Sequence, residues 1–226
     1  MNFDLTDEQV MMRDTFARFL DENSSMARVR KAQESGGFDH ALWTGLAELG
    51  AFAMRVPEEA DGMGLGLFDA GLLMEEAGRT LASGPLAEAL VATRLLGLLG
   101  GQEDLLAAAL GGEAVVTIAM QDIAAFPRQW VAGGLVAGAV IARRDNAVVL
   151  VTVPAEARIA EPTLATTAIA ELDLGALPAT VLASGEDALA LFAAGREEWK
   201  VLMALALSGL SRAALTMACL LYTSPS

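Results

Sequence analysis

The residues that could do chemistry in this chain of 226 residues are few, and most of them are carboxylates. Glutamates occur in adjacent pairs at Glu58–Glu59, Glu75–Glu76 and Glu197–Glu198, and a carboxylate pair could supply a general acid and a general base. Paired glutamates that open a helix are, however, usually solvated residues favoured by the helix dipole. His40 is the only histidine and Cys219 the only cysteine, which excludes a histidine-based triad and an intrachain disulfide.

A glycine-rich stretch between residues 43 and 85 is the most distinctive part of the sequence. It contains a short helical pattern that Gly50 ends, and then three glycines at positions 62, 64 and 66 before the next helical pattern. Glycines at this spacing mark a loop in which the backbone turns tightly or approaches another group closely. Such loops join helices in many proteins, so the glycines alone do not identify a function.

The first half of the chain is predicted to be helical throughout. Thr6 and Gln9 form a capping box at the start of the first helix. The polar segment from Gln33 to Gly37 is expected to be a linker, and the basic residues Arg28, Arg30 and Lys31 are expected to lie in a loop. Asp39 and Asp69 are expected to cap the helices that follow them. The helices predicted after this loop are residues 40–49, 69–81, 86–99 and 102–110.

Short β-branched runs begin at residue 113 and predict a small β domain. The clearest turn within it is Arg143-Arg144-Asp145-Asn146. The connections are too short for helical crossovers, so we expect an antiparallel arrangement. The strands predicted are residues 115–120, 135–141, 148–153 and 179–183.

Charge and composition exclude several classes of partner. The formal net charge is −14, which would repel nucleic acid and anionic membranes. The N-terminus is acidic and lacks a signal peptide, so we expect a cytoplasmic protein. Residues 201–222 are apolar enough to span a bilayer, but Arg212 near their middle would be costly there. We therefore expect a helix buried at the centre of a bundle and no membrane, with a membrane-anchored helical protein as an alternative.

The distinctive stretch resembles the N-terminal domain of the acyl-CoA dehydrogenase family. The resemblance is carried by Leu49-Gly50, Val56-Pro57-Glu58-Glu59, a Gly-x-Gly-Leu within residues 62–67 and Met74-Glu75-Glu76-Ala77-Gly78-Arg79, and the opening Phe3–Gln9 is also similar. It implies an α+β multi-domain fold, with a helical N-terminal domain over residues 1–112 and a small antiparallel β domain over 113–185. Residues 186–226 would be the start of a C-terminal helical bundle. The family is longer, so the resemblance implies a fragment, and residues 219–226 look foreign to it.

The resemblance also implies a reaction, the α,β-desaturation of an acyl-CoA by FAD, with an electron-transfer flavoprotein or a similar acceptor and a homo- or hetero-oligomer as partners. By position, Met120, Gln121 and Asp122 would contact the flavin. Gln121 and Asp122 stand where the family has threonine and glutamate, and the glycine and serine of that motif have no clear counterparts. The usual catalytic glutamate is absent. A minority of the family carries the base on the helix near Glu197 and Glu198, and either residue could take that place.

Two functional hypotheses follow from the resemblance. One is a dehydrogenase, and the other is a non-catalytic partner subunit of a mixed oligomer, which the eroded flavin motif favours. By either hypothesis, this chain alone is expected to show no dehydrogenase turnover. The resemblance also implies that the glutamate pairs Glu58–Glu59 and Glu75–Glu76 are scaffold.

Overall fold

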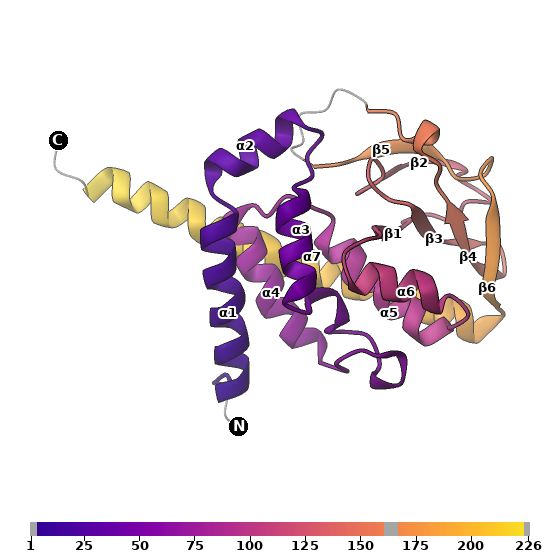
Figure 1. Ribbon diagram of the computed structural model, residues 1–226, viewed down its shortest axis with the longest axis horizontal. Coiled ribbons are helices and arrows are strands. Elements are labelled where there is room, and N and C mark those ends of the chain that lie inside the picture. The colour runs from indigo at the N-terminus through magenta and orange to yellow at the C-terminus, as the bar shows by residue number, and fades with distance from the viewer. Residues whose placement is uncertain (1–3, 161–166, 224–226) are drawn as a thin grey trace.

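The computed structural model describes residues 4–160 and 167–223, which form a helical part and a β part joined by one long helix (Figure 1). In the view of Figure 1 the helices α1 to α4 lie to the left of the strands, α5 and α6 lie below the strands, and α7 runs past both parts. The helices are α1 (Asp7–Asn23), α2 (Met26–Glu34), α3 (His40–Glu48), α4 (Leu67–Thr80), α5 (Leu86–Leu99), α6 (Glu103–Leu110) and α7 (Glu186–Thr223), with short 3-10 turns at η1 (Ala51–Ala53), η2 (Glu58–Ala60) and η3 (Ala155–Ala157). The strands are β1 (Val116–Ile118), β2 (Arg128–Val131), β3 (Ala139–Arg144), β4 (Ala147–Thr152), β5 (Ala170–Asp173) and β6 (Ala179–Ser184).

The predicted helix starts are mostly confirmed, and their side-chain caps account for them. Thr6 and Gln9 form the expected capping box on α1, and the Asp39 carboxylate accepts a hydrogen bond from the Leu42 amide at the start of α3. Asp69 acts differently from the prediction. It is the third residue of α4, and its carboxylate reaches back to accept from the Gly66 amide.

The loop expected at Arg28, Arg30 and Lys31 is wrong, because all three lie in α2, which also takes in the first two residues of the predicted linker. Ser25 caps α2, and only Val29 and Ala32 of this helix are buried, so the sequence carries a weak hydrophobic pattern there. Arg28 forms an ion pair with Asp39 at 2.8 Å and thereby holds α2 against the start of α3.

The glycine-rich loop between η1 and α4 is tight for two separate reasons. A side chain at Gly62 would collide with the Val56 carbonyl oxygen, 2.1 Å from its Cβ, so the backbone passes too close for any other residue. Gly64 has a φ of +60°, as does its neighbour Asp61 at +59°. Asp is among the residues that tolerate this conformation, which explains its place before Gly62.

The β part is less regular than the sequence predicts. Its strands form two sheets, β1-β3-β4-β6 and β2-β5, and neither β2 nor β5 is among the predicted strands. Three of the four strand pairings in these sheets are antiparallel, but β1 and β3 run parallel, which corrects the purely antiparallel expectation. Residues 119–138 connect β1 to β3 and contain β2, a connection long enough for the crossover that parallel neighbours require. The predicted turn before Ala147 is confirmed, with Asp145 at a φ of +51°.

The helices α4 and α7 are in main-chain contact where they cross, because glycines lie at the crossing point. A Cβ on Gly78 would lie 1.9 Å from the Ala206 carbonyl oxygen, and a Cβ on Gly209 would lie 1.8 Å from the Glu75 carbonyl oxygen. Each helix therefore has a glycine at the point where the main chain of the other helix approaches it most closely. This contact fixes the position of the middle of α7 against the helical part.

The last third of α7 projects beyond α1 in Figure 1 and packs on little of the chain. Leu207, Leu215, Met217 and Leu220 are all exposed, which corrects the prediction of a helix buried at the centre of a bundle. Among the described helices, α7 is the one long and apolar enough to cross a membrane by length and composition, a criterion that core helices of soluble proteins also meet.

Candidate functional site

A cavity of about 430 Å³ lies where the helical part, the β part and α7 meet. Its walls come from the end of α4, the connection to α5 and the start of α5, the residues after β2, the residues before β5 and the middle of α7. The described lining residues are Met74, Ala77, Gly78, Leu81, Ala82, Ser83, Gly84, Pro85, Leu86, Ala87, Glu88, Ala132, Gly133, Thr167, Ala168, Trp199, Met203, Ala206, Leu207 and Leu210. This lining is predominantly apolar with a few polar groups, as in many small-molecule sites.

Glu88 is the one ionisable side chain among the described residues that line this cavity. It lies in the first turn of α5 and is only 5% exposed, and its Oε1 accepts a hydrogen bond of 2.7 Å from the Trp199 indole N–H on α7. Burial raises the pKa of Glu88 above its ordinary value of 4.5, while the hydrogen bonds from Trp199 and from the backbone lower it in part. The cavity thus contains a carboxyl group held in place and shifted toward its neutral form.

Glu198 lies beside Trp199 but belongs to a different cluster. Its Oε1 accepts from Arg55 at 3.0 Å and from Arg94 at 2.9 Å, and its side chain is only 14% exposed. Arg55 also donates to the Leu65 carbonyl oxygen. This carboxylate therefore ties α7 to α5 and to the segment after η1, and it does not line the cavity.

The Glu197 side chain, in contrast, faces solvent. Its side chain is 68% exposed and pairs with Lys200 one turn later. Both glutamates lie inside α7, which begins at Glu186, and not at a helix start as the sequence suggested. The structure brings neither of them to the cavity, and the assignment of a base to either residue remains a prediction.

The turn after β1 holds the residues predicted to contact flavin, and it lies outside the described lining of this cavity. Gln129 closes the turn by accepting from the Gln121 amide at 3.1 Å and donating to the Gln121 carbonyl oxygen at 3.3 Å. Asp122 accepts from the amides of Ala124 and Asp145 and pairs with Arg143 at 3.0 Å.

These pairings bear on whether the residues present fit a flavin. The main-chain amide of Gln121 and the carboxylate of Asp122 are already paired within the protein, so as arranged neither group fits a contact with flavin. Met120 is half-buried and packs against the helical core. The assignment of these three residues to FAD stays a prediction that this geometry does not support.

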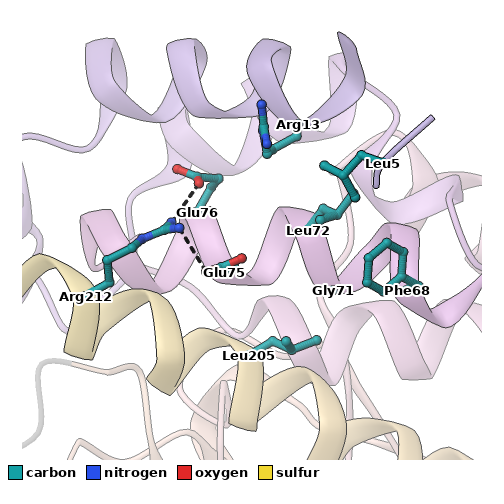
Figure 2. Close-up of a pocket in the computed structure, with 9 residues that line it drawn as sticks. All are labelled: Leu5, Arg13, Phe68, Gly71, Leu72, Glu75, Glu76, Leu205 and Arg212. Carbon is teal, nitrogen blue, oxygen red and sulfur yellow. Dashed lines mark hydrogen bonds and ion pairs between the residues drawn. The ribbon is translucent and has the colours of Figure 1, made fainter. Parts of the chain in front are cut away.

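A second, open groove of about 470 Å³ lies between α1, α4 and α7 (Figure 2). One end is apolar and holds Leu5, Phe68 and Leu72, and the other is closed by Arg212, which pairs with Glu75 and Glu76 at 3.0 Å each. Arg79 pairs with the same Glu76. The glutamate pair at 75–76 therefore acts as an electrostatic link between α4 and α7, in agreement with its interpretation as scaffold.

The residues at the main cavity that sequence reasoning missed are Glu88 and Trp199. One signal for Glu88 is present in the sequence, because it is the only acidic residue in the apolar helix LAEALVATRLLGLL. No spacing rule links it to Trp199, which is 111 residues away.

Comparisons with known proteins agree on one family. Residues 6–105 match the family described as acyl-CoA dehydrogenase, N-terminal domain. Benzylmalonyl-CoA dehydrogenase of Aromatoleum aromaticum is 41% identical over 128 residues, which cover 54% of this chain and 34% of that protein. The chain spans about a third of the length of the curated relatives it matches.

Solved structures extend the likeness over nearly all of this chain. A variant of the Tcur3481-Tcur3483 steroid ACAD matches with a TM-score of 0.80 and 25% identity, covering 97% of this chain and 68% of that one. A chain of the ChsE4-ChsE5 complex from Mycobacterium tuberculosis matches with a TM-score of 0.74 at 22% identity, covering 100% of this chain and 70% of that one. At 22% identity, the comparison with the ChsE4-ChsE5 chain shows a similar fold only.

Proposed function

We propose that this chain, which belongs to the acyl-CoA dehydrogenase family, forms the acyl-binding part of an enzyme that desaturates a CoA thioester at its α and β carbons. The observation that carries this proposal is the apolar cavity of about 430 Å³ between the helical part and the β part. FAD, which is typical of the family, would accept the hydride in such a reaction. The cytoplasm as location and an electron-transfer flavoprotein as acceptor remain predictions.

The chain's own residues would bind and position the acyl group. Met74, Leu81, Met203 and Leu210 give the cavity apolar walls from both α4 and α7. Burial of an acyl chain there removes apolar surface from water, worth roughly 0.8 kcal/mol for each methylene group.

Binding of octanoyl-CoA tests the proposal, because it needs no turnover. Isothermal titration of the purified chain should show binding that Leu207→Trp weakens, since Leu207 lines the cavity and is 57% exposed. Leu215→Trp is the matched control, because Leu215 is 66% exposed on the same helix but outside the described lining. Equal affinity in the two variants would contradict an acyl site in this cavity.

A non-catalytic partner subunit is the second candidate, and the pairing of Gln121 and Asp122 within the protein favours it. The two similar structures with two-part names, one of them described as a complex, also support a mixed assembly. Co-purification with a second family subunit, followed by flavin absorbance of each separated subunit, tests this reading. Flavin held by this chain alone would favour the dehydrogenase, and flavin held only by the other subunit would favour the partner. Recovery of the chain in the soluble fraction would remove the membrane-anchored alternative.

A further inference from the structure

The acyl cavity contains a carboxyl group that binding of a plain hydrocarbon chain does not need. Glu88 is buried, lines the cavity and is the only ionisable side chain in its described lining. Burial of a carboxyl group costs free energy that hydrogen bonds offset, and a carboxyl group in an apolar wall can make a further hydrogen bond to a ligand in the cavity.

Trp199 fixes the orientation of this carboxyl group. The indole N–H donates to Oε1 of Glu88 at 2.7 Å, and Trp199 itself lines the cavity from α7. Because Oε1 accepts from Trp199, Oε2 is the oxygen that would contact a ligand. In a protonated carboxyl group that oxygen carries the O–H and acts as a donor.

The environment of Glu88 shifts its carboxyl group toward the protonated form. Burial raises the pKa of Glu88, and the hydrogen bonds from Trp199 and the backbone offset only part of that rise. No cation is among the causes of this shift, and Arg55 and Arg94 pair with Glu198. A neutral carboxyl group that donates into a pocket is a recognised way to bind an oxygen acceptor.

We propose that Glu88, oriented by Trp199, selects acyl groups that carry a hydrogen-bond-accepting oxygen, such as a keto oxygen, at their buried end. This inference rests on the proposed function, since it assigns a substrate class to the same cavity. The other polar side chains in the described lining, Ser83 and Thr167, carry hydroxyl groups that both donate and accept, so they discriminate less between ligands. Glu88 is a specificity residue in this proposal and not the base.

Two matched thioesters test it, 3-cyclohexylpropanoyl-CoA and 3-(4-oxocyclohexyl)propanoyl-CoA, which differ by one carbonyl oxygen. The quantity measured is the ratio of their dissociation constants by isothermal titration of the purified chain at pH 6. We expect the ratio to favour the keto ligand by about three- to tenfold more in the wild type than in Glu88→Leu, the range for one neutral hydrogen bond. Glu88→Gln should keep the preference, because its amide accepts from Trp199 and still offers an N–H.

Trp199→Phe is the second variant, and it keeps the ring while removing the N–H. It should lower the ratio by which the keto ligand is preferred. Because Trp199 lines the cavity, this ratio is the readout, since a loss of packing common to both ligands cancels in it. The inference is overturned if Glu88→Leu keeps the wild-type ratio, or if folded Glu88→Gln loses it. If both ligands bind equally to wild type, the specificity fails while the acyl site stands. If neither binds, the proposed function fails as well.

Discussion

Removal of the Glu198 carboxylate should destabilise the chain strongly, while removal of its neighbour Glu197 should not. Glu198 pairs with both Arg55 and Arg94, and the side chains of Glu198 and Arg55 are 14% and 12% exposed. Glu198→Ala would leave two guanidinium groups near each other with no counter-charge. Breaking a fully buried pair in this way costs about 3–5 kcal/mol, and the partial exposure of Arg94 reduces the expected loss to about 2–3 kcal/mol.

Thermal unfolding followed by circular dichroism measures this loss. For a chain of this size, about 2–3 kcal/mol corresponds to a fall of roughly 5–10 °C in Tm. Glu197→Ala is the matched control, because Glu197 is 68% exposed and its single pair with Lys200 contributes less than about 0.5 kcal/mol. Glu198→Gln should lie between the two, since it keeps a hydrogen-bond acceptor but loses the charge.

The result also separates two roles for Glu198. A carboxylate kept only as a catalytic base would be replaced by alanine with little loss of stability, or even with a gain. A fall in Tm no larger than that of Glu197→Ala would refute the structural reading and return Glu198 to the list of candidate bases.

Three further perturbations test other parts of the fold. Gly209→Ala should cost more than about 2 kcal/mol, because its Cβ would meet the Glu75 carbonyl oxygen, whereas Gly138→Ala, with no heavy atom within 4 Å, should be close to neutral by urea unfolding. Glu88 has a raised folded pKa, so between 4.5 and that value the folded chain holds the extra proton and wild-type stability falls as pH rises, by up to about 1.4 kcal/mol per pH unit. Glu88→Gln should remove this fall, and a constant difference between the two chains in urea unfolding across pH 4.5–7 would contradict the shift. Arg212→Ala should lower the free energy of unfolding by about 0.5–1.5 kcal/mol, because half of its side chain is exposed, and this loss should shrink in 1 M salt.

The sequence predicts the helical scaffold well because the signals there are local. The capping box at Thr6, the cap at Asp39 and the close backbone approach at Gly62 each depend on residues a few positions apart. The polar helix α2 was not predicted because it buries only two residues. The parallel pairing of β1 with β3 was not predicted because it joins strands that are far apart in the sequence. Most of the helical scaffold could therefore be derived from the sequence, whereas α2, the strands β2 and β5, the parallel pairing and the exposed end of α7 could not.

The candidate site is harder to predict because its parts meet only through tertiary packing. Glu88 and Trp199 are far apart in sequence, and they meet because Gly78 and Gly209 let α7 lie directly on α4, next to the start of α5. The sequence directs attention to Glu197 and Glu198 because they are adjacent, but one is solvated and the other neutralises two arginines. Adjacency along a helix places side chains about 100° apart, so the two members of such a pair face different surroundings. A lone carboxylate in an apolar helix is thus the better sequence signal for a buried functional group, since its burial has to be compensated by a partner or a ligand.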